Sequence, residues 1–93
     1  MIKYTQAQIT EKLAQFEGWE YVEGGLFASF EFDNFKEAFS AMTRISFEAE
    51  RLNHHPEWTN VYNTVEIFLS THDADGVTEK DFELAAIIDL LIG

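Results

Sequence analysis

Three histidines stand out among the side chains of this sequence that could do chemistry. They are the only histidines in the 93-residue chain, and they fall close together at His54, His55 and His72. An imidazole with an ordinary pKa near 6.5 can hold or release a proton at neutral pH, so one ring can donate while another accepts. If the three rings share one pocket, they favour acid–base catalysis on a small polar substrate, such as the elimination of water.

Other kinds of chemistry fit these residues less well. Three histidines could bind a catalytic zinc ion, but the neighbouring side chains of His54 and His55 tend to point in different directions. The sequence has no His-x-His or Glu-x-x-His spacing, no nucleophile elbow and no glycine-rich phosphate loop. We therefore expect neither a metal ion nor an organic cofactor. Each histidine taken alone could equally be an ordinary surface or core residue.

Two further residues have both a functional and a structural interpretation. Trp58 lies two residues after Pro56 and could stack on a flat ring or simply belong to the core. Asp81 could serve the same site or only cap a helix, together with Thr78. The acidic segment 73–79 lacks the spacing of an EF-hand, so we expect a solvated loop there and no calcium.

Composition limits the classes of protein to consider. A length of 93 residues suits one domain, covering residues 1–93, and 46% hydrophobic with 25% charged residues is ordinary for a globular protein. The formal net charge of −11 disfavours direct binding to nucleic acid or to an anionic membrane surface. The chain has no cysteine, no segment resembling a signal peptide and no apolar run of about 18 residues. We expect a cytoplasmic protein that does not enter a membrane.

Hydrophobic periodicity predicts the elements that position the histidines. The expected order is a helix, two strands, a helix, two strands and a helix, with the Gly24-Gly25 pair turning the first hairpin. An apolar stripe from Phe35 to Leu52 predicts the central helix, capped by Asp33 or Asn34. The expected elements cover residues 5–16, 19–21, 26–32, 35–52, 58–62 and 65–71, followed by a last helix that Thr78 and Asp81 cap and that holds residues 82–92. This order predicts an α+β fold of two layers, a four-stranded antiparallel sheet with helices packed on one face.

The same pattern predicts the surroundings of His72 and of the last helix. If the fourth strand stays regular, His72 shares a face with Ser70 and Phe68, away from the buried face, so a ligand can reach it. The last helix is apolar on more than one side, which is more than one sheet can cover. We therefore predict contact with another subunit, in a homodimer or homotetramer.

The segment around the histidines resembles the pterin-4a-carbinolamine dehydratases. The resemblance is carried by a carboxylate, a His-His-Pro sequence, an aromatic residue, a later histidine and a later aspartate at that family's spacing. In this chain it runs from about residue 39 to residue 89, with one departure at Arg51, where lysine is common in the family. The matching segments are 49–58, 60–63, 69–73, 76–78, 81–82 and 84–85.

The resemblance implies dehydration of 4a-hydroxytetrahydropterin to quinonoid dihydropterin, which recycles the pterin cofactor of aromatic amino acid hydroxylases. It implies the fold described above, in dimers or tetramers, with His54, His55 and His72 as the catalytic residues. It also implies that four residues line the substrate, namely Asn53, Ser70, Thr71 and Asp73. The alternatives are a non-enzymatic dimerisation or regulatory partner of another protein, a metal-dependent enzyme, and a relative with a different substrate.

Overall fold

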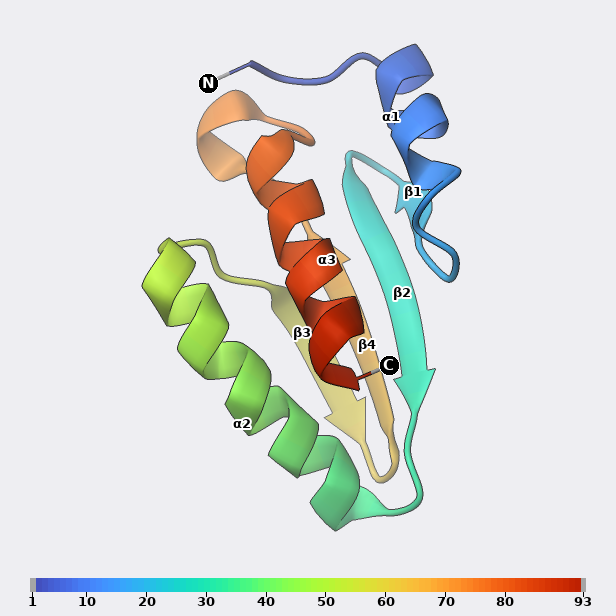
Figure 1. The fold of residues 1–93 in the computed structure, drawn as a ribbon, viewed down its shortest axis with the longest axis vertical. Helices are drawn as coiled ribbons and strands as arrows, with labels where there is room; N and C mark the ends of the chain where they lie inside the picture. The colour runs from blue at the N-terminus through green and yellow to red at the C-terminus, as the bar shows by residue number, and fades with distance from the viewer. Residues whose placement is uncertain (1, 93) are drawn as a thin grey trace.

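The computed structural model describes residues 2–92 and contains the expected helices and strands in the expected order. A short 3-10 helix, η1, is the one addition to that order within residues 2–92. The elements, coloured along the chain in Figure 1, are α1 (Gln6–Leu13), β1 (Glu20–Val22), β2 (Gly25–Glu31), α2 (Phe35–Leu52), β3 (Glu57–Val61), β4 (Thr64–Leu69), η1 (His72–Ala74) and α3 (Glu79–Ile92).

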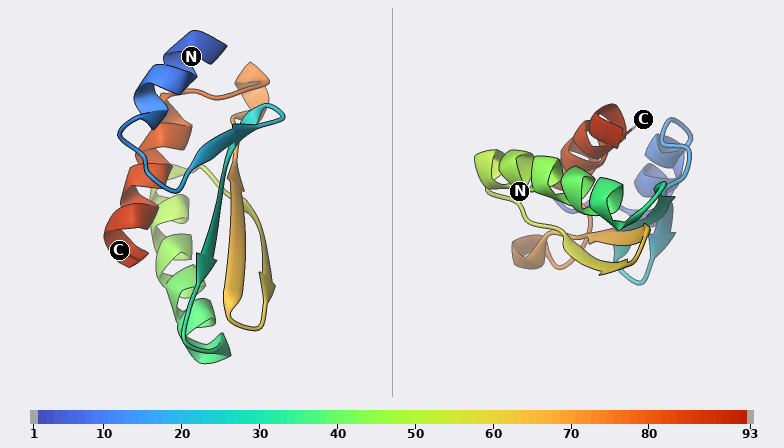
Figure 2. Two further views of the ribbon diagram at one scale, coloured as in Figure 1. Left: turned by 90° about the vertical axis from the view of Figure 1, so that its right-hand side faces the viewer. Right: turned by 90° about the horizontal axis from the view of Figure 1, so that it is seen from below.

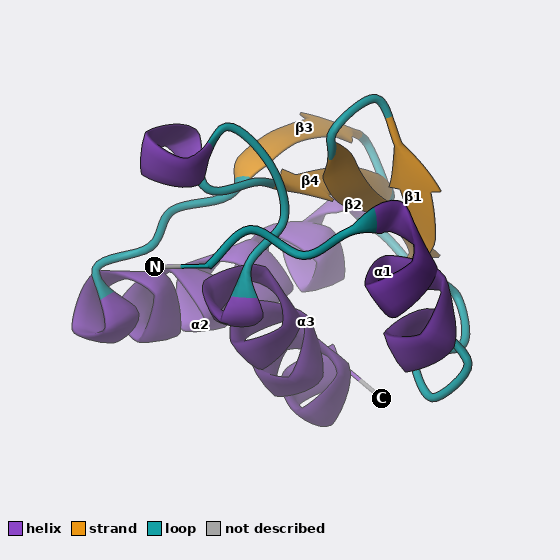
Figure 3. Cartoon of the chain, turned by 90° about the horizontal axis from the view of Figure 1, so that it is seen from above, coloured by secondary structure: helices purple, strands orange, loops and turns teal. Residues whose placement is uncertain are grey.

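The four strands form one antiparallel sheet in the order β1-β2-β4-β3. Helices α2 and α3 lie side by side across one face, and α1 covers the β1 end on the same side, as Figures 1 and 2 show. The view from above in Figure 3 separates α1, α2 and α3 from the sheet, and no α-helix among the described residues covers its other face. The predicted α+β, two-layer fold class is confirmed.

Alternation along the strands decides which side chains enter the core. Along β4, Val65, Ile67 and Leu69 are buried, whereas Glu66 is exposed. The pairing of β2 with β4 sets Leu26 opposite Leu69, so both strands bury the same face. The open face therefore carries the residues of opposite parity, including Phe68 of β4 and the cross-strand Phe27.

The central helix buries most of the predicted stripe but not its two phenylalanines. Phe35 and Phe39 are 52% and 54% exposed. Small side chains let the helix approach the sheet closely, and they turn these phenylalanines away from the core. The buried positions of α2 are Ala38, Ala41, Ile45 and Ala49.

The N-terminal segment is tied to the start of α3. The Tyr4 backbone N–H donates to the Val77 carbonyl at 2.8 Å, and the Tyr4 hydroxyl donates to the Glu79 carboxylate. The hydrogen bond to Glu79, with a smaller effect of burial and of the Glu79 charge, raises the pKa of the Tyr4 phenol. The neutral phenol therefore supports this contact below pH 10, and ionisation of the phenol at more alkaline pH weakens it.

The first hairpin turns one residue earlier than predicted. Its central residues are Glu23 and Gly24, with φ angles of 44° and 89°, and Gly25 already belongs to β2. Residue 25 must be glycine because the end of β4 lies very close to it. A Cβ atom there would lie 2.7 Å from the Leu69 carbonyl oxygen and would overlap the Phe68 ring. The absence of a side chain at residue 25 therefore lets the Phe68 ring lie against β2.

We expect Gly25→Ala to destabilise the protein by about 1–3 kcal/mol, because the added methyl group must push apart β2 and β4 or displace the Phe68 ring. Urea unfolding measures this change. The matched control is Ser29→Ala, at an exposed position of the same strand, which should change the free energy of unfolding by less than about 0.5 kcal/mol. Equal stability of the two variants would show that the predicted overlap has no cost.

Candidate active site

The structure brings all three histidines to one hollow. The chain leaving α2 carries His54 and His55, and it meets the chain leaving β4, which carries His72. Together they line a hollow of about 280 Å³. Its lining residues are Asn53, His54, His55, Ser70, Thr71, His72, Asp73 and Lys80. We call this the histidine hollow.

The end of α2 places His54. Asn53 adopts the left-handed conformation with φ 53°, which asparagine tolerates better than most residues. Its N–H donates to the Glu50 carbonyl at 3.2 Å, and the His54 N–H donates to the Ala49 carbonyl at 3.0 Å. These two bonds form a Schellman motif, which stops the helix and turns the following residue back toward it. His54 is consequently only 8% exposed.

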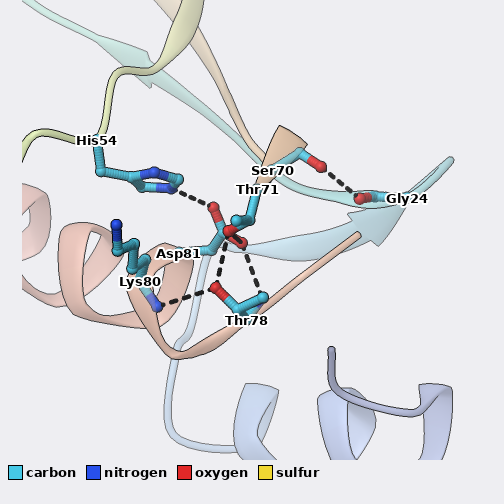
Figure 4. Close-up of polar contacts among 7 residues, drawn as sticks. All are labelled: Gly24, His54, Ser70, Thr71, Thr78, Lys80 and Asp81. Atoms are coloured by element: carbon cyan, nitrogen blue, oxygen red, sulfur yellow. Dashed lines mark hydrogen bonds and ion pairs between the residues drawn. The ribbon is translucent and has the colours of Figure 1, made fainter. Parts of the chain in front are cut away.

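The buried carboxylate of Asp81 holds the His54 ring. Asp81 lies in the first turn of α3, and its Oδ1 is 2.6 Å from Nε2 of His54. Its Oδ2 accepts the Thr71 hydroxyl at 2.8 Å and the Thr78 backbone N–H at 2.9 Å. The predicted capping pair of Thr78 and Asp81 is therefore present, and its carboxylate also serves the histidine. Figure 4 shows these contacts converging on Asp81.

The donors in this network can be assigned from its connectivity. Because the Thr71 hydroxyl donates to Asp81, the 2.7 Å contact between the two threonines requires that Thr78 donates to Thr71. Thr78 Oγ1 in turn accepts the Lys80 backbone N–H at 3.2 Å. With Oδ2 already occupied by two donors, Oδ1 accepts the Nε2 proton of His54. Nδ1 then remains as the ring nitrogen of His54 that can accept a proton from a ligand.

The other two histidines are exposed and less constrained. Nε2 of His55 lies 3.0 Å from the Glu50 carboxylate, in a pair that is open to solvent. The regular strand predicted to reach His72 is not present, because β4 ends at Leu69 and His72 begins η1. His72 is nevertheless exposed, so a ligand can reach it as predicted, although strand parity is not the reason.

A second hollow of about 490 Å³ adjoins the first. It shares His55, Ser70, Thr71 and His72 with the histidine hollow. The Ser70 hydroxyl donates to the Gly24 carbonyl at 3.0 Å, which fixes this shared wall to the first hairpin (Figure 4). The residues of the second hollow that do not line the histidine hollow are Pro56, Glu57, Phe68 and Asp75. We call it the outer hollow.

Two predicted site residues do not line either of these hollows. Trp58 pairs with Ile67, whose side chain is fully buried, so Trp58 lies on the helix-covered face and packs partly against the core. Asp81 is completely buried behind His54, where it contacts the histidine rather than the open space. Trp58 therefore cannot stack on a ligand in these hollows, and Asp81 acts through His54.

Sequence reasoning missed several lining residues. Lys80 was not predicted to line the site. Its position directly before the candidate residue Asp81 is the sequence feature that could have indicated it. Phe68 was placed correctly on the face of Ser70, but its role in the wall of the outer hollow depends on the chain fold after residue 69. Within residues 2–92, no group of three or more His, Cys, Asp or Glu side chains is arranged to hold a metal ion.

The described residues also contain no helix that is both long and apolar enough to span a membrane.

Over almost its whole length, the chain is similar to known proteins of one family. Residues 2–91 match the profile of the family described as pterin 4 alpha carbinolamine dehydratase. A protein of Christiangramia forsetii with that provisional name is 56% identical over 99% of this chain and 95% of its own length. A relative from Rhizobium meliloti, provisionally named in the same way, is 55% identical over 94% of this chain and 86% of its own.

A solved structure is also very similar. It is a Brucella melitensis protein described as a transcriptional coactivator/pterin dehydratase, with a TM-score of 0.96 and 37% sequence identity. The similarity covers 99% of this chain and 100% of that one.

His54 and His72 should differ in how much each contributes to the free energy of unfolding. His54→Ala leaves the buried Asp81 carboxylate without one of its partners, and we expect a loss of about 1–3 kcal/mol in the free energy of unfolding. His72→Ala is the matched control, because this exposed ring should contribute less than about 0.5 kcal/mol. Urea unfolding followed by circular dichroism measures both. A loss at His72 as large as that at His54 would contradict the different environments described here.

Proposed function

Because the chain belongs to the pterin 4 alpha carbinolamine dehydratase family, we propose that it dehydrates 4a-hydroxytetrahydropterin to quinonoid dihydropterin. We further propose that it does so as a single domain by histidine acid–base catalysis. The observation that carries the mechanism is the presence of three imidazoles on one hollow, with one of them fixed by a buried carboxylate.

The reaction requires one acid and one base. The substrate carries a hydroxyl group on C4a, next to the N–H group at N5. Protonation of the hydroxyl oxygen lets the C–O bond break and water leave, while loss of the N5 proton lets the nitrogen electron pair form the C4a=N5 double bond. One proton is gained and one is lost, so the reaction needs no oxidant or reductant.

His54 and His72 are the proposed proton-transfer groups. The hydrogen bond from Nε2 of His54 to Asp81 leaves Nδ1 to take the N5 proton, and the nearby carboxylate stabilises the imidazolium that forms. His72 is exposed, so solvent can restore its proton after it protonates the leaving hydroxyl. Asp81 never touches the substrate in this scheme and is a positioning residue.

The remaining lining residues bind and orient the substrate. His55, beside Glu50, forms part of the wall between the two hollows and is proposed to position the ring. Polar side chains around the histidine hollow offer donors and acceptors to a pterin, whose ring carries both kinds of group. They are Asn53, Ser70, Thr71, Asp73 and Lys80.

In the cell, the proposed activity would recycle the pterin cofactor of aromatic amino acid hydroxylases. The proposed reaction itself needs neither a metal ion nor an organic cofactor, because both proton transfers are made by side chains. The cytoplasmic location stays a prediction from the sequence.

The helix layer supports a proposal about assembly. Phe35, Phe39 and Phe47 lie on α2 and are more than half exposed, and Leu90 of α3 is 84% exposed. Such apolar side chains on neighbouring helices favour contact with another copy of the chain, as a homodimer or homotetramer. They also favour a second candidate function, as a dimerisation or regulatory partner of another protein.

Single alanine variants test the catalytic proposal. We expect His54→Ala and His72→Ala to lower kcat by about 10²- to 10⁴-fold each, and His55→Ala to act mainly on KM. The assay follows loss of the carbinolamine spectroscopically, above the spontaneous rate, at a temperature where every variant is folded. Wild-type activity should survive a metal chelator. Full activity in all three variants would refute the acid–base proposal, and loss of activity with chelator would favour a metal-dependent enzyme.

Light scattering tests the assembly proposal. The wild-type protein at micromolar concentration should be a dimer or tetramer, and Phe39→Glu/Phe47→Glu should be smaller because each carboxylate resists burial in the interface. Ile2→Glu changes another exposed apolar residue outside the helix layer and should leave the assembly intact. A monomeric wild-type protein would rule out the homo-oligomer, and a pull-down comparing wild type with the double variant would then test the regulatory role.

A further inference from the structure

The two hollows continue onto the open face of the sheet. A third hollow of about 350 Å³ shares Glu57 and Phe68 with the outer hollow. Its other lining residues are Val22, Glu23, Phe27, Thr59, Glu66 and Trp58, although the Trp58 side chain lies on the helix-covered face. The outer and third hollows adjoin along these two residues, and we call the pair the trough, which begins at His55 and His72 and ends over β1 and β2.

The position of the histidines limits where a substrate can extend. His54 lines only the histidine hollow, so a ring placed between His54 and His72 must occupy that hollow. The histidine hollow and the trough meet at the four residues that line both, His55, Ser70, Thr71 and His72. A substituent attached to the ring can therefore extend past these residues into the trough.

The floor of the trough is apolar. Phe27 and Phe68 face each other across β2 and β4 on the open side of the sheet. The Phe68 ring lies against the backbone at Gly25, where any Cβ atom would overlap it. This contact places the Phe68 ring against β2, where it and Phe27 can pack against an uncharged substituent.

Apart from His55 and His72 at its start, the charged residues of the trough are all acidic. Glu57 and Asp75 line its start, and Glu23 and Glu66 line its far part. Its lining contains no lysine or arginine, and Lys80 borders only the histidine hollow. The net charge of the whole chain, −11, adds repulsion of the same sign. An anionic group that lies past His55 and His72 would therefore be repelled, with no lysine or arginine in the lining to compensate.

We propose that this trough receives the ring substituent of the substrate, and that Glu57 and Asp75 make the enzyme discriminate against substituents that end in carboxylate or phosphate. This inference rests on the proposed dehydratase function and concerns which carbinolamines it uses. Glu57 and Asp75 are specificity-determining residues, because they face the substituent and not the reacting atoms.

The test compares two carbinolamines that share an aromatic substituent, one ending in a neutral amide and the other in two carboxylates. For the wild type at an ionic strength of about 0.01 M, we expect kcat/KM to be about tenfold lower for the anionic compound. Repulsion by the acidic lining should lower kcat/KM roughly threefold for each of its two carboxylates. At about 1 M the difference should shrink to less than about twofold, because the screening length falls from about 30 Å to about 3 Å.

Charge variants separate the trough from the charge of the whole protein. Glu57→Gln/Asp75→Asn should bring the ratio between the two compounds at low salt to within about threefold. Glu11→Gln/Glu83→Gln removes the same charge from exposed positions on α1 and α3, outside the trough, and should keep the wild-type ratio.

Each outcome has a distinct meaning. Equal use of the two compounds by the wild type at low salt would overturn the inference and leave the dehydratase function standing. A control variant that narrows the ratio as much as the trough variant would also overturn it, because net charge would then explain the effect. Failure to accelerate either compound above the spontaneous rate would instead refute the proposed function.

Discussion

The contact between His54 and Asp81 joins three parts of the fold. The histidine leaves the end of α2, the aspartate lies in the first turn of α3, and the carboxylate also binds Thr71, which follows β4. A buried carboxylate is costly unless its oxygens are satisfied, and here they accept three donors. The N-terminus of α3 adds a favourable electrostatic environment for the negative charge. The hydrogen bonds that satisfy the buried carboxylate therefore also orient the His54 ring, which lines the histidine hollow.

Differences in burial give the histidines different properties. The buried His54 ring is hydrogen-bonded to Asp81 through Nε2, which leaves Nδ1 without this partner. His55 and His72 are open to solvent. A fixed ring suits a proton transfer that depends on geometry, and an exposed ring can exchange its proton with water. The local structure supports this division, because the left-handed Asn53 directs His54 inward and the early end of β4 leaves His72 outside the sheet.

The open sheet face is the region that we propose selects the substrate. Because α1, α2 and α3 pack on the other face, Phe27 and Phe68 stay half-exposed next to the hollow that His72 borders. The acidic surroundings of these rings follow the composition of the chain, in which 17 acidic residues outnumber 6 basic ones. Catalysis and substrate selection are thus assigned to neighbouring surfaces that share Ser70, Thr71 and two histidines.

The sequence by itself determined the order of elements, the fold class and the family, because period-two and helical patterns and the His-His-Pro spacing are local properties of the chain. It also predicted Asn34 as one of two helix caps and the pairing of Thr78 with Asp81. Only the tertiary structure decided that Asp81 holds His54, that Trp58 lies on the covered face and that Gly25 makes room for Phe68. Each of these contacts joins residues from different elements, and their distances depend on how helices and strands pack, which no local pattern encodes.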